Sequence, residues 1–136
     1  MNKVELVEVG PRDGLQNEKG LIPAVQKIAL IDSLSDAGFR LIEATSFVSA
    51  KWVPQLGDAA EVMAGIQRIA GVGYIVLTPN KRGLDDALAA GVDEVAVFGA
   101  ATEGFSQHNI NCSVAESLDR FRPVVADALA AGVRVR

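Results

Sequence analysis

Several features that would assign the chain to a broad functional class are scarce or missing. The 136 residues include one cysteine, Cys112, so no internal disulfide can form and no Cys-x-x-Cys pair exists to chelate zinc or carry redox chemistry. No uncharged apolar run approaches the roughly 20 residues that a membrane span requires. Basic residues number 13 against 17 acidic ones, a balance that does not favour a general nucleic-acid binder.

The start of the sequence also lacks targeting signals. It has neither the long apolar stretch of a secretory signal nor the Arg/Ser-rich leader of an organelle import peptide, so we expect a reducing, cytoplasmic location and no membrane partner. Apolar residues make up 49% of the chain, which is enough for a real core and excludes disorder. The length allows one ordinary domain and not two.

A repeated Ala-Gly pair is the clearest sign of internal organisation. Each of four such pairs precedes a short aliphatic run, and a glycine just past a helix end closes the last turn in a left-handed conformation before the chain enters a strand. The repeated unit is therefore predicted to be helix, glycine, strand. The four glycines are Gly38, Gly71, Gly91 and Gly132.

Helical spacing of apolar residues fills the segments between these runs. One pattern follows Pro23, a second follows Asp58 with Glu61, and a third contains Leu84. A Ser113/Glu116 capping box predicts the start of a fourth, although Pro123 should kink that helix or delay its start. The apolar stripes are Ala24, Ile28, Ile31 and Leu34; Val62, Ile66 and Ile69; Leu84, Ala87 and Leu88; and Val114, Leu118, Phe121 and Val125.

Together with a first strand over Val4–Val9, this order predicts an α/β fold with a parallel sheet. No Gly-x-Gly-x-x-Gly follows the first strand, so a dinucleotide-binding fold lacks support. The alternative is a (β/α)₈ TIM barrel, which needs about 250 residues. We therefore expect residues 1–136 to be the N-terminal half of a single TIM-barrel catalytic domain, covering about the first four βα units.

Ligands of parallel α/β proteins bind at the C-terminal ends of the strands. Arg12 and Asp13 follow the first strand, and Glu43 and Ser46 lie at the end of the second. A carboxylate there is a hard ligand suited to Mg²⁺ or Mn²⁺, and an adjacent arginine can stabilise an enolate oxygen. A bare Arg-Asp-Gly would usually be a surface ion pair, but the neighbouring Glu43 and Ser46 favour a site.

Longer motifs at these strand ends resemble the hydroxymethylglutaryl-CoA lyase family over essentially the whole chain. Arg-Asp-Gly-x-Gln alone indicates only the wider superfamily of metal-dependent acyl-CoA lyases and Claisen-type synthases, whereas the stretch from Thr45 to Gln55 is similar to the lyases themselves. The matching segments are Val7–Glu18, Ile42–Ser49, Lys51–Gln55, Leu77–Asn80, Val97–Ala100 and Asn109–Ser113.

The resemblance implies a TIM-barrel enzyme that cleaves 3-hydroxy-3-methylglutaryl-CoA into acetyl-CoA and acetoacetate, a step of leucine degradation and ketone-body formation, with Mg²⁺ or Mn²⁺. It places the metal-ligand Asp on Asp13, the enolate-stabilising Arg on Arg12 and the acidic active-site residue on Glu43. Gln16 and Ser46 are expected on the substrate side. The implied partners are an acyl-CoA substrate and, at full length, further copies of the same chain.

Part of the family's machinery is missing from this sequence. The family completes its metal site with a His-x-His pair and an Asn and uses a Cys on a late loop, whereas His108 is the only histidine here and Cys112 stands at a different motif position. One carboxylate does not make a tight Mg²⁺ site, so the chain alone is expected to be inactive. A non-catalytic half-barrel and a sister enzyme acting on another acyl-CoA remain as alternatives.

Overall fold

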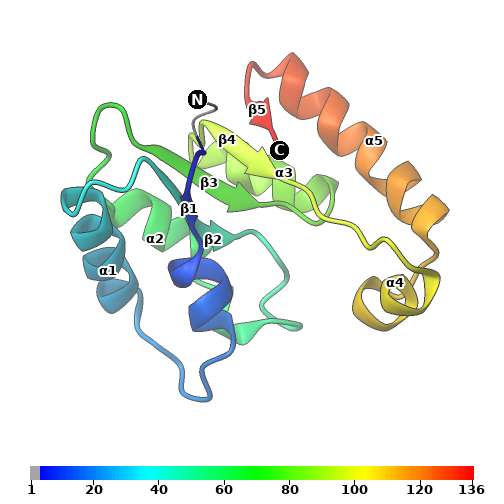
Figure 1. Ribbon diagram of the computed structural model, residues 1–136, viewed down its shortest axis with the longest axis horizontal. Coiled ribbons are helices and arrows are strands. Elements are labelled where there is room, and N and C mark those ends of the chain that lie inside the picture. The colour runs from blue at the N-terminus through cyan, green and yellow to red at the C-terminus, as the bar shows by residue number, and fades with distance from the viewer. Residues whose placement is uncertain (1–3) are drawn as a thin grey trace.

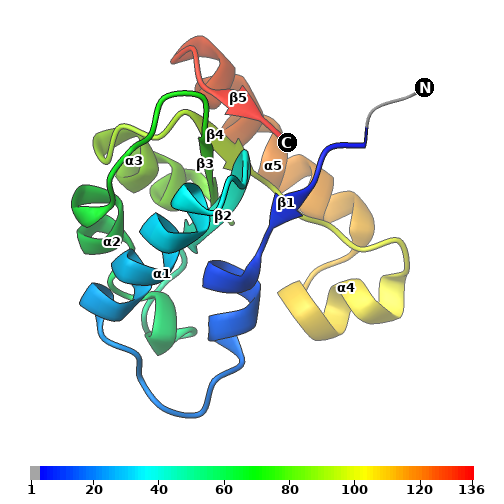
Figure 2. The ribbon, with the colours of Figure 1, turned by 60° about the vertical axis from the view of Figure 1, so that its left-hand side comes forward.

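The computed structural model describes residues 4–136 as a five-stranded parallel sheet with helices between the strands (Figure 1). The strands lie in sequence order, and each pairs in parallel with the next. β1 and β5 are therefore the two edges of the described sheet, and the sheet is curved (Figure 2). This confirms the predicted α/β class. The strands are β1 (Val7–Glu8), β2 (Leu41–Ser46), β3 (Gly73–Leu77), β4 (Glu94–Ala96) and β5 (Arg134–Val135).

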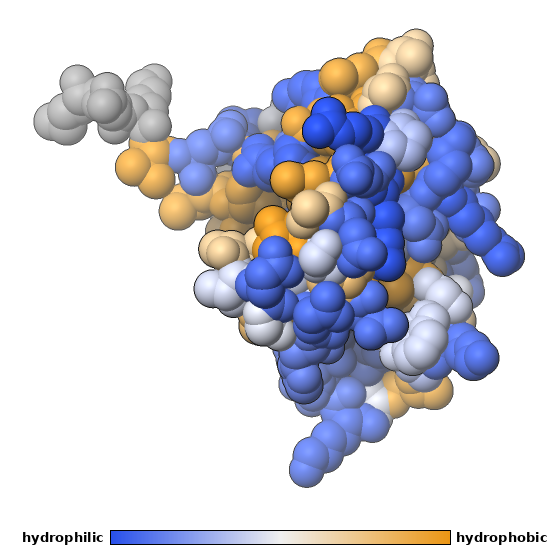
Figure 3. Space-filling model, turned by 90° about the vertical axis from the view of Figure 1, so that its right-hand side faces the viewer, coloured by the Kyte–Doolittle hydropathy of each residue, from blue (hydrophilic) through white to orange (hydrophobic). Residues whose placement is uncertain are grey.

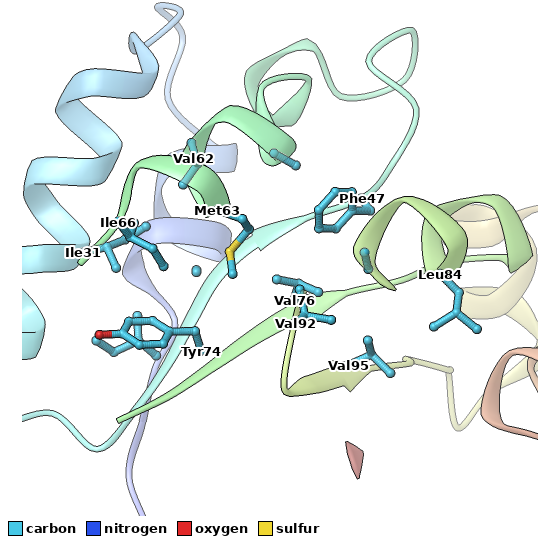
Figure 4. Close-up of a cluster of buried hydrophobic side chains, with 14 of the residues drawn as sticks. Ile31, Phe47, Val62, Met63, Ile66, Tyr74, Val76, Leu84, Val92 and Val95 are labelled. Carbon is cyan, nitrogen blue, oxygen red and sulfur yellow. The ribbon is translucent and has the colours of Figure 1, made fainter. Parts of the chain in front are cut away.

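Helices α1, α2, α3 and α5 pack on one face of this sheet through a shared core (Figure 4). Alternate residues of a strand point to opposite faces, so Tyr74 and Val76 of β3 join the helical core while Ile75 joins a smaller cluster on the other face. Within residues 4–136, no helix has the length and apolar character to cross a membrane. The helices are α1 (Ala24–Asp36), α2 (Ala59–Gly65), α3 (Lys81–Ala89), α4 (Glu103–Ile110) and α5 (Val114–Ala130), with short helical turns η1 (Gly10–Gly14) and η2 (Pro54–Leu56).

The four glycines of the Ala-Gly pairs adopt the predicted left-handed conformation. Their φ angles are +97° at Gly38, +84° at Gly71, +66° at Gly91 and +75° at Gly132. A side chain is disfavoured at such angles, so glycine lets the chain turn towards the next strand at each point. The helix, glycine, strand repeat is confirmed at Gly38, Gly91 and Gly132, whereas Gly71 lies in a turn six residues after the end of α2 and does not cap that helix.

Several predicted boundaries are wrong. β1 covers Val7–Glu8 instead of Val4–Val9, because only these two residues pair with β2. α2 ends at Gly65, so Ile69 lies outside the helix. An additional helix, α4, precedes the helix that Ser113 caps and is not one of the four predicted helices.

The C-terminal helix also differs from expectation. α5 begins at Val114, directly after the Ser113 cap, and continues through Pro123 without a delayed start. Pro123 is exposed, so the helix carbonyl that lacks a partner N–H faces solvent. The buried stripe is rotated relative to the expected one, since Leu118 is 56% exposed. The buried residues are Ser117, Phe121, Val124 and Ala128.

Candidate active site

A cavity of about 900 Å³ opens at the C-terminal ends of the strands. Its first wall comes from η1, the end of β2 and the loop after β2, and its second wall from the end of β3, the segments after β3 and β4, α4 and α5. Phe98 and Phe121 form a tilted aromatic pair in this wall, with ring centroids 6.1 Å apart. The outward face of α4 and α5 is mostly hydrophilic (Figure 3). The polar side chains of the first wall are Arg12, Asp13, Gln16 and Ser46.

The turn η1 presents Arg12 and Asp13 to this cavity. The backbone N–H groups of Arg12, Asp13 and Gly14 all donate to the carbonyl oxygen of Val9, at 3.2, 2.7 and 3.4 Å. The preceding N–H, of Gly10, donates to Oε1 of Glu8 at 2.6 Å. The chain therefore winds tightly around the end of β1, and both predicted site residues project from a turn whose backbone is well bonded.

Arg12 connects two carboxylates. Its Nε donates to Oε1 of Glu43, and its Nη1 lies 3.1 Å from Oδ1 of Asp13 and 3.5 Å from Oε1 of Gln16. The Arg12 and Glu43 side chains are only 17% and 10% exposed, so this pair is largely shielded from water. No group within residues 4–136 hydrogen-bonds to Nη2 of Arg12. Arg12 thus lines the cavity with a guanidinium that is held in place and whose Nη2 can donate to a ligand.

A bulge in β2 brings Glu43 and Ser46 to the same face. Two residues three apart in a regular strand point to opposite faces. The register with β3 shifts between Glu43 and Thr45, so one extra residue is inserted and Ser46 turns back to the side of Glu43. Glu43 lies inside β2 and not at its end, which corrects its expected position, and Ser46 is the last residue of the strand.

Glu43 pairs with Arg12 but does not line the cavity, whereas the other predicted site residues do. Asp13 is 57% exposed and offers one carboxylate. Among the described residues, no three His, Cys, Asp or Glu side chains gather into a metal-binding group. His108 is exposed on α4, and Cys112 is buried as a free thiol.

Several cavity residues were not among the predicted site residues, and α5 supplies two of them that stand out. Arg120 of α5 lines the cavity and donates from Nη1 to the carbonyl oxygen of Ile110 at 3.3 Å, and Phe121 completes the aromatic pair. The α5 capping box could have located the helix but not the side that it turns towards the cavity. Asn80 also lines the cavity, while its side chain caps α3 by accepting from the N–H of Gly83 at 2.9 Å.

Comparison with known proteins identifies the family. The family model described as HMGL-like matches residues 3–136. The chain belongs to the HMGL-like family. It is 60% identical over 134 residues to the mitochondrial hydroxymethylglutaryl-CoA lyase of Bos taurus, covering 98% of this chain and 41% of that protein. It is 57% identical to the cytoplasmic 3-hydroxy-3-methylglutaryl-CoA lyase of Mus musculus, covering 98% and 39%.

Solved structures of this HMGL-like family share the fold. The hydroxymethylglutaryl-CoA lyase of Pseudomonas aeruginosa matches with a TM-score of 0.95 and 60% identity over 98% of this chain and 45% of that one. An HMG-CoA lyase of Acinetobacter baumannii, solved with coenzyme A and 3-methylmalate, matches with a TM-score of 0.90 and 37% identity over 96% and 43%. The chain spans less than half the length of these relatives, and its open sheet is part of an HMGL-like TIM barrel.

Proposed function

We propose that this chain is the N-terminal half of a TIM-barrel lyase that cleaves 3-hydroxy-3-methylglutaryl-CoA into acetyl-CoA and acetoacetate. The observation that carries the proposal is the shielded Arg12–Glu43 pair beside Asp13 in the wall of a cavity of about 900 Å³. The names of its relatives support the reaction, and the relative solved with coenzyme A supports an acyl-CoA substrate.

The proposed reaction is a retro-Claisen cleavage. A base takes the proton from the C3 hydroxyl, the C2–C3 bond breaks, and C3 becomes the ketone carbon of acetoacetate. The electron pair of the broken bond forms the enolate of acetyl-CoA, which then takes up a proton at C2. Negative charge therefore develops on the thioester oxygen, where a positioned cationic donor lowers the barrier most.

Arg12 is proposed as that donor. Its Nε is held by Glu43 and its Nη1 by Asp13, which leaves Nη2 to hydrogen-bond with the thioester oxygen. Glu43, expected from the sequence to be catalytic, is proposed to act through Arg12 as a positioning residue, since its carboxylate lies behind the guanidinium. Gln16 and Ser46 line the same cavity and are proposed to contact the substrate.

Asp13 is the residue that we propose to hold a divalent cation. Its carboxylate is a hard donor at the cavity wall, and its 57% exposure leaves it accessible. It fits as one ligand of Mg²⁺ or Mn²⁺, and the remaining ligands must come from outside residues 4–136. When bound, the cation supplies a Lewis acid that polarises substrate oxygens.

Location, pathway and assembly belong to the same proposal. Relatives are named both mitochondrial and cytoplasmic, and we propose a cytoplasmic enzyme of leucine degradation. We also propose that the full-length protein is a homo-oligomer with no nucleic-acid partner. Cell fractionation and sedimentation of the full-length protein test the location and the assembly.

The test of the proposed function is acetoacetate release by the complete polypeptide that carries this chain. The substrates are 3-hydroxy-3-methylglutaryl-CoA and a panel of other 3-hydroxyacyl-CoA thioesters, each with Mg²⁺, Mn²⁺ or EDTA. We expect metal-dependent cleavage of the first substrate to exceed all others. Preference for another thioester would instead support a sister enzyme.

The isolated 136 residues provide the control. The edges β1 and β5 carry unpaired backbone groups, so we expect self-association and no cleavage even with metal. Addition of the C-terminal half of the barrel, in trans or by fusion, should restore activity. A monomeric chain of 136 residues that cleaves the substrate unaided would contradict the half-barrel assignment.

A further inference from the structure

A fully buried lysine connects α1 to the segment that follows β2. Lys27 is 3% exposed, and its Nζ lies 2.8 Å from both carboxylate oxygens of Asp58 and also donates to the carbonyl oxygen of Gln55. Lysine is almost never buried unless it is paired, because desolvation of an ammonium is costly. All three N–H donors of Lys27 are used here, so these hydrogen bonds hold Lys27 of α1 against both Gln55 and Asp58.

Gln55 extends this connection to a second segment. Its side chain is nearly as buried, and its amide accepts from the backbone N–H of Ile22 at 2.9 Å and donates to the carbonyl oxygen of Gly20 at 2.8 Å. One side chain thus replaces a pair of backbone hydrogen bonds between the loop after β2 and the loop before α1.

These two loops carry or adjoin the residues of the first wall of the cavity. Asp13 and Gln16 precede the loop that Gln55 holds, and Val48 and Trp52 precede Gln55 itself. Trp52 is 78% exposed yet lines the cavity, so its position depends on the loop backbone and little on packing around its ring. Among the described residues, the side chain of Gln55 makes the hydrogen bonds that join the loop before α1 to the loop after β2.

We propose that Lys27, Gln55 and Asp58 form a clamp that positions this wall against the acyl-CoA substrate. The three are positioning residues, since none of them lines the cavity. This inference rests on the proposed lyase function. The clamp does not contact Arg12 or Glu43, so its loss should displace the wall while the guanidinium pair stays in place.

The test compares Gln55→Ala with wild type in the complete polypeptide. We expect kcat/KM for 3-hydroxy-3-methylglutaryl-CoA to fall about ten- to a hundredfold, the scale associated with an ångström of misplacement. The pH profile of kcat should be unchanged, because Arg12 and Glu43 remain paired. Gln55→Glu keeps the acceptor for Ile22 but sets a buried carboxylate oxygen against the carbonyl oxygen of Gly20, so its loss should be at least as large.

Limited trypsin digestion supplies a readout independent of activity. Lys19 and Lys51 are exposed sites within the two loops, and cleavage after both should accelerate in Gln55→Ala. The control Tyr74→Phe removes a buried hydroxyl near the start of β3 that contacts Ser35 Oγ at 3.0 Å, and it should leave both cleavage rates unchanged.

The outcomes separate the clamp from the proposed function. Unchanged kcat/KM and unchanged cleavage in Gln55→Ala would overturn the clamp, as would an equal loss of kcat/KM in Tyr74→Phe. If Gln55→Ala does not fold, the double variant Lys27→Met with Asp58→Asn removes both charges together. Its kcat/KM and its trypsin cleavage rates are then compared with wild type in the same way. If wild type cleaves no acyl-CoA, the proposed function fails and the trypsin rates alone decide whether the clamp holds the loops.

Discussion

Two shielded carboxylates lie on this sheet, and each is paired with arginine. Glu43 of β2 is 10% exposed at its side chain and pairs with Arg12. Glu94 of β4 is 6% exposed and lies 3.1 Å from Nη2 of Arg134 and 2.9 Å from Nε of Arg136. The two carboxylates therefore have the same chemistry and nearly the same burial.

Their partners differ in what they face. Arg12 is 17% exposed, lines the large cavity and is flanked by a second carboxylate, whereas Arg134 and Arg136 are 67% and 45% exposed and line neither of the cavities found among the described residues. Glu94 pairs with Arg134 in the register between β4 and β5, so its ion pairs hold an edge strand. A buried carboxylate paired with arginine is thus by itself no evidence for a site, and the adjoining cavity makes the difference.

The largest expected effect is the loss of Arg12. Arg12→Gln in the complete polypeptide should lower kcat about a hundredfold or more, the usual scale for one donor to a developing oxyanion. Arg12→Lys should recover only part of this, because a point charge cannot contact Glu43 and the substrate through a planar fork. Steady-state kinetics measures both.

Arg136→Gln is the matched control, since it removes an arginine from the other carboxylate. Its kcat should stay within a few-fold of wild type. A rise in KM alone for Arg12→Gln would make Arg12 a binding group, and equal losses in the two variants would abolish the distinction between the two pairs.

Asp13→Ala should remove most of the metal-dependent activity with little loss of stability, because the side chain is exposed in a turn held by backbone bonds. Mn²⁺ binding, followed by electron paramagnetic resonance, measures affinity directly. Asp93→Ala, another exposed carboxylate beside a strand, is the control. Full activity and unchanged Mn²⁺ affinity in Asp13→Ala would exclude it as a ligand.

Local chemistry made much of this fold predictable. The four glycine turns follow from the left-handed preference of glycine, and the start of α5 follows from the reciprocal bonds of Ser113 and Glu116. α4 was missed because its apolar residues show no helical stripe, although Thr102 caps its first turn and Asn111 ends it in the left-handed conformation. Those two caps were the available signal.

The site was predictable as a set of residues and not as a geometry. The proximity of Arg12 to Glu43 follows from adjacent parallel strands, but the bulge that aligns Glu43 with Ser46 arises from pairing with β3 and leaves no local signal. The burial of Lys27 was equally hidden, because its partners lie 28 and 31 positions away in the sequence.

A smaller effect, on stability alone, is expected at Glu94. Arg134→Met with Arg136→Met leaves this buried carboxylate without its two cationic partners, which should cost about 2 kcal/mol of unfolding free energy. Glu94→Gln should cost less, because the charges that remain are on exposed arginines. Urea denaturation measures both. A double variant as stable as wild type would show that these pairs are dispensable, and a large loss of kcat would show that this region also serves catalysis.

The smallest effect is expected at an exposed carboxylate, Glu116, which helps to begin the helix that supplies Arg120 and Phe121 to the cavity. The backbone N–H of Ser113, followed by its side chain, stabilises the ionised form and lowers the pKa of Glu116 from its ordinary value of 4.5.

A carboxyl whose pKa is lower in the folded state adds stability above its unfolded pKa, and this stability is lost as the pH falls through the folded value. Glu116→Gln keeps a neutral capping box, so its unfolding free energy should decline less than that of wild type between neutral pH and pH values below 4.5. Urea denaturation across this range is the measurement, with Glu61→Gln, an exposed first-turn residue of α2, as the control. Parallel pH curves for wild type and Glu116→Gln would contradict the contribution, and a change in kcat would mean that this exposed cap is coupled to the cavity wall.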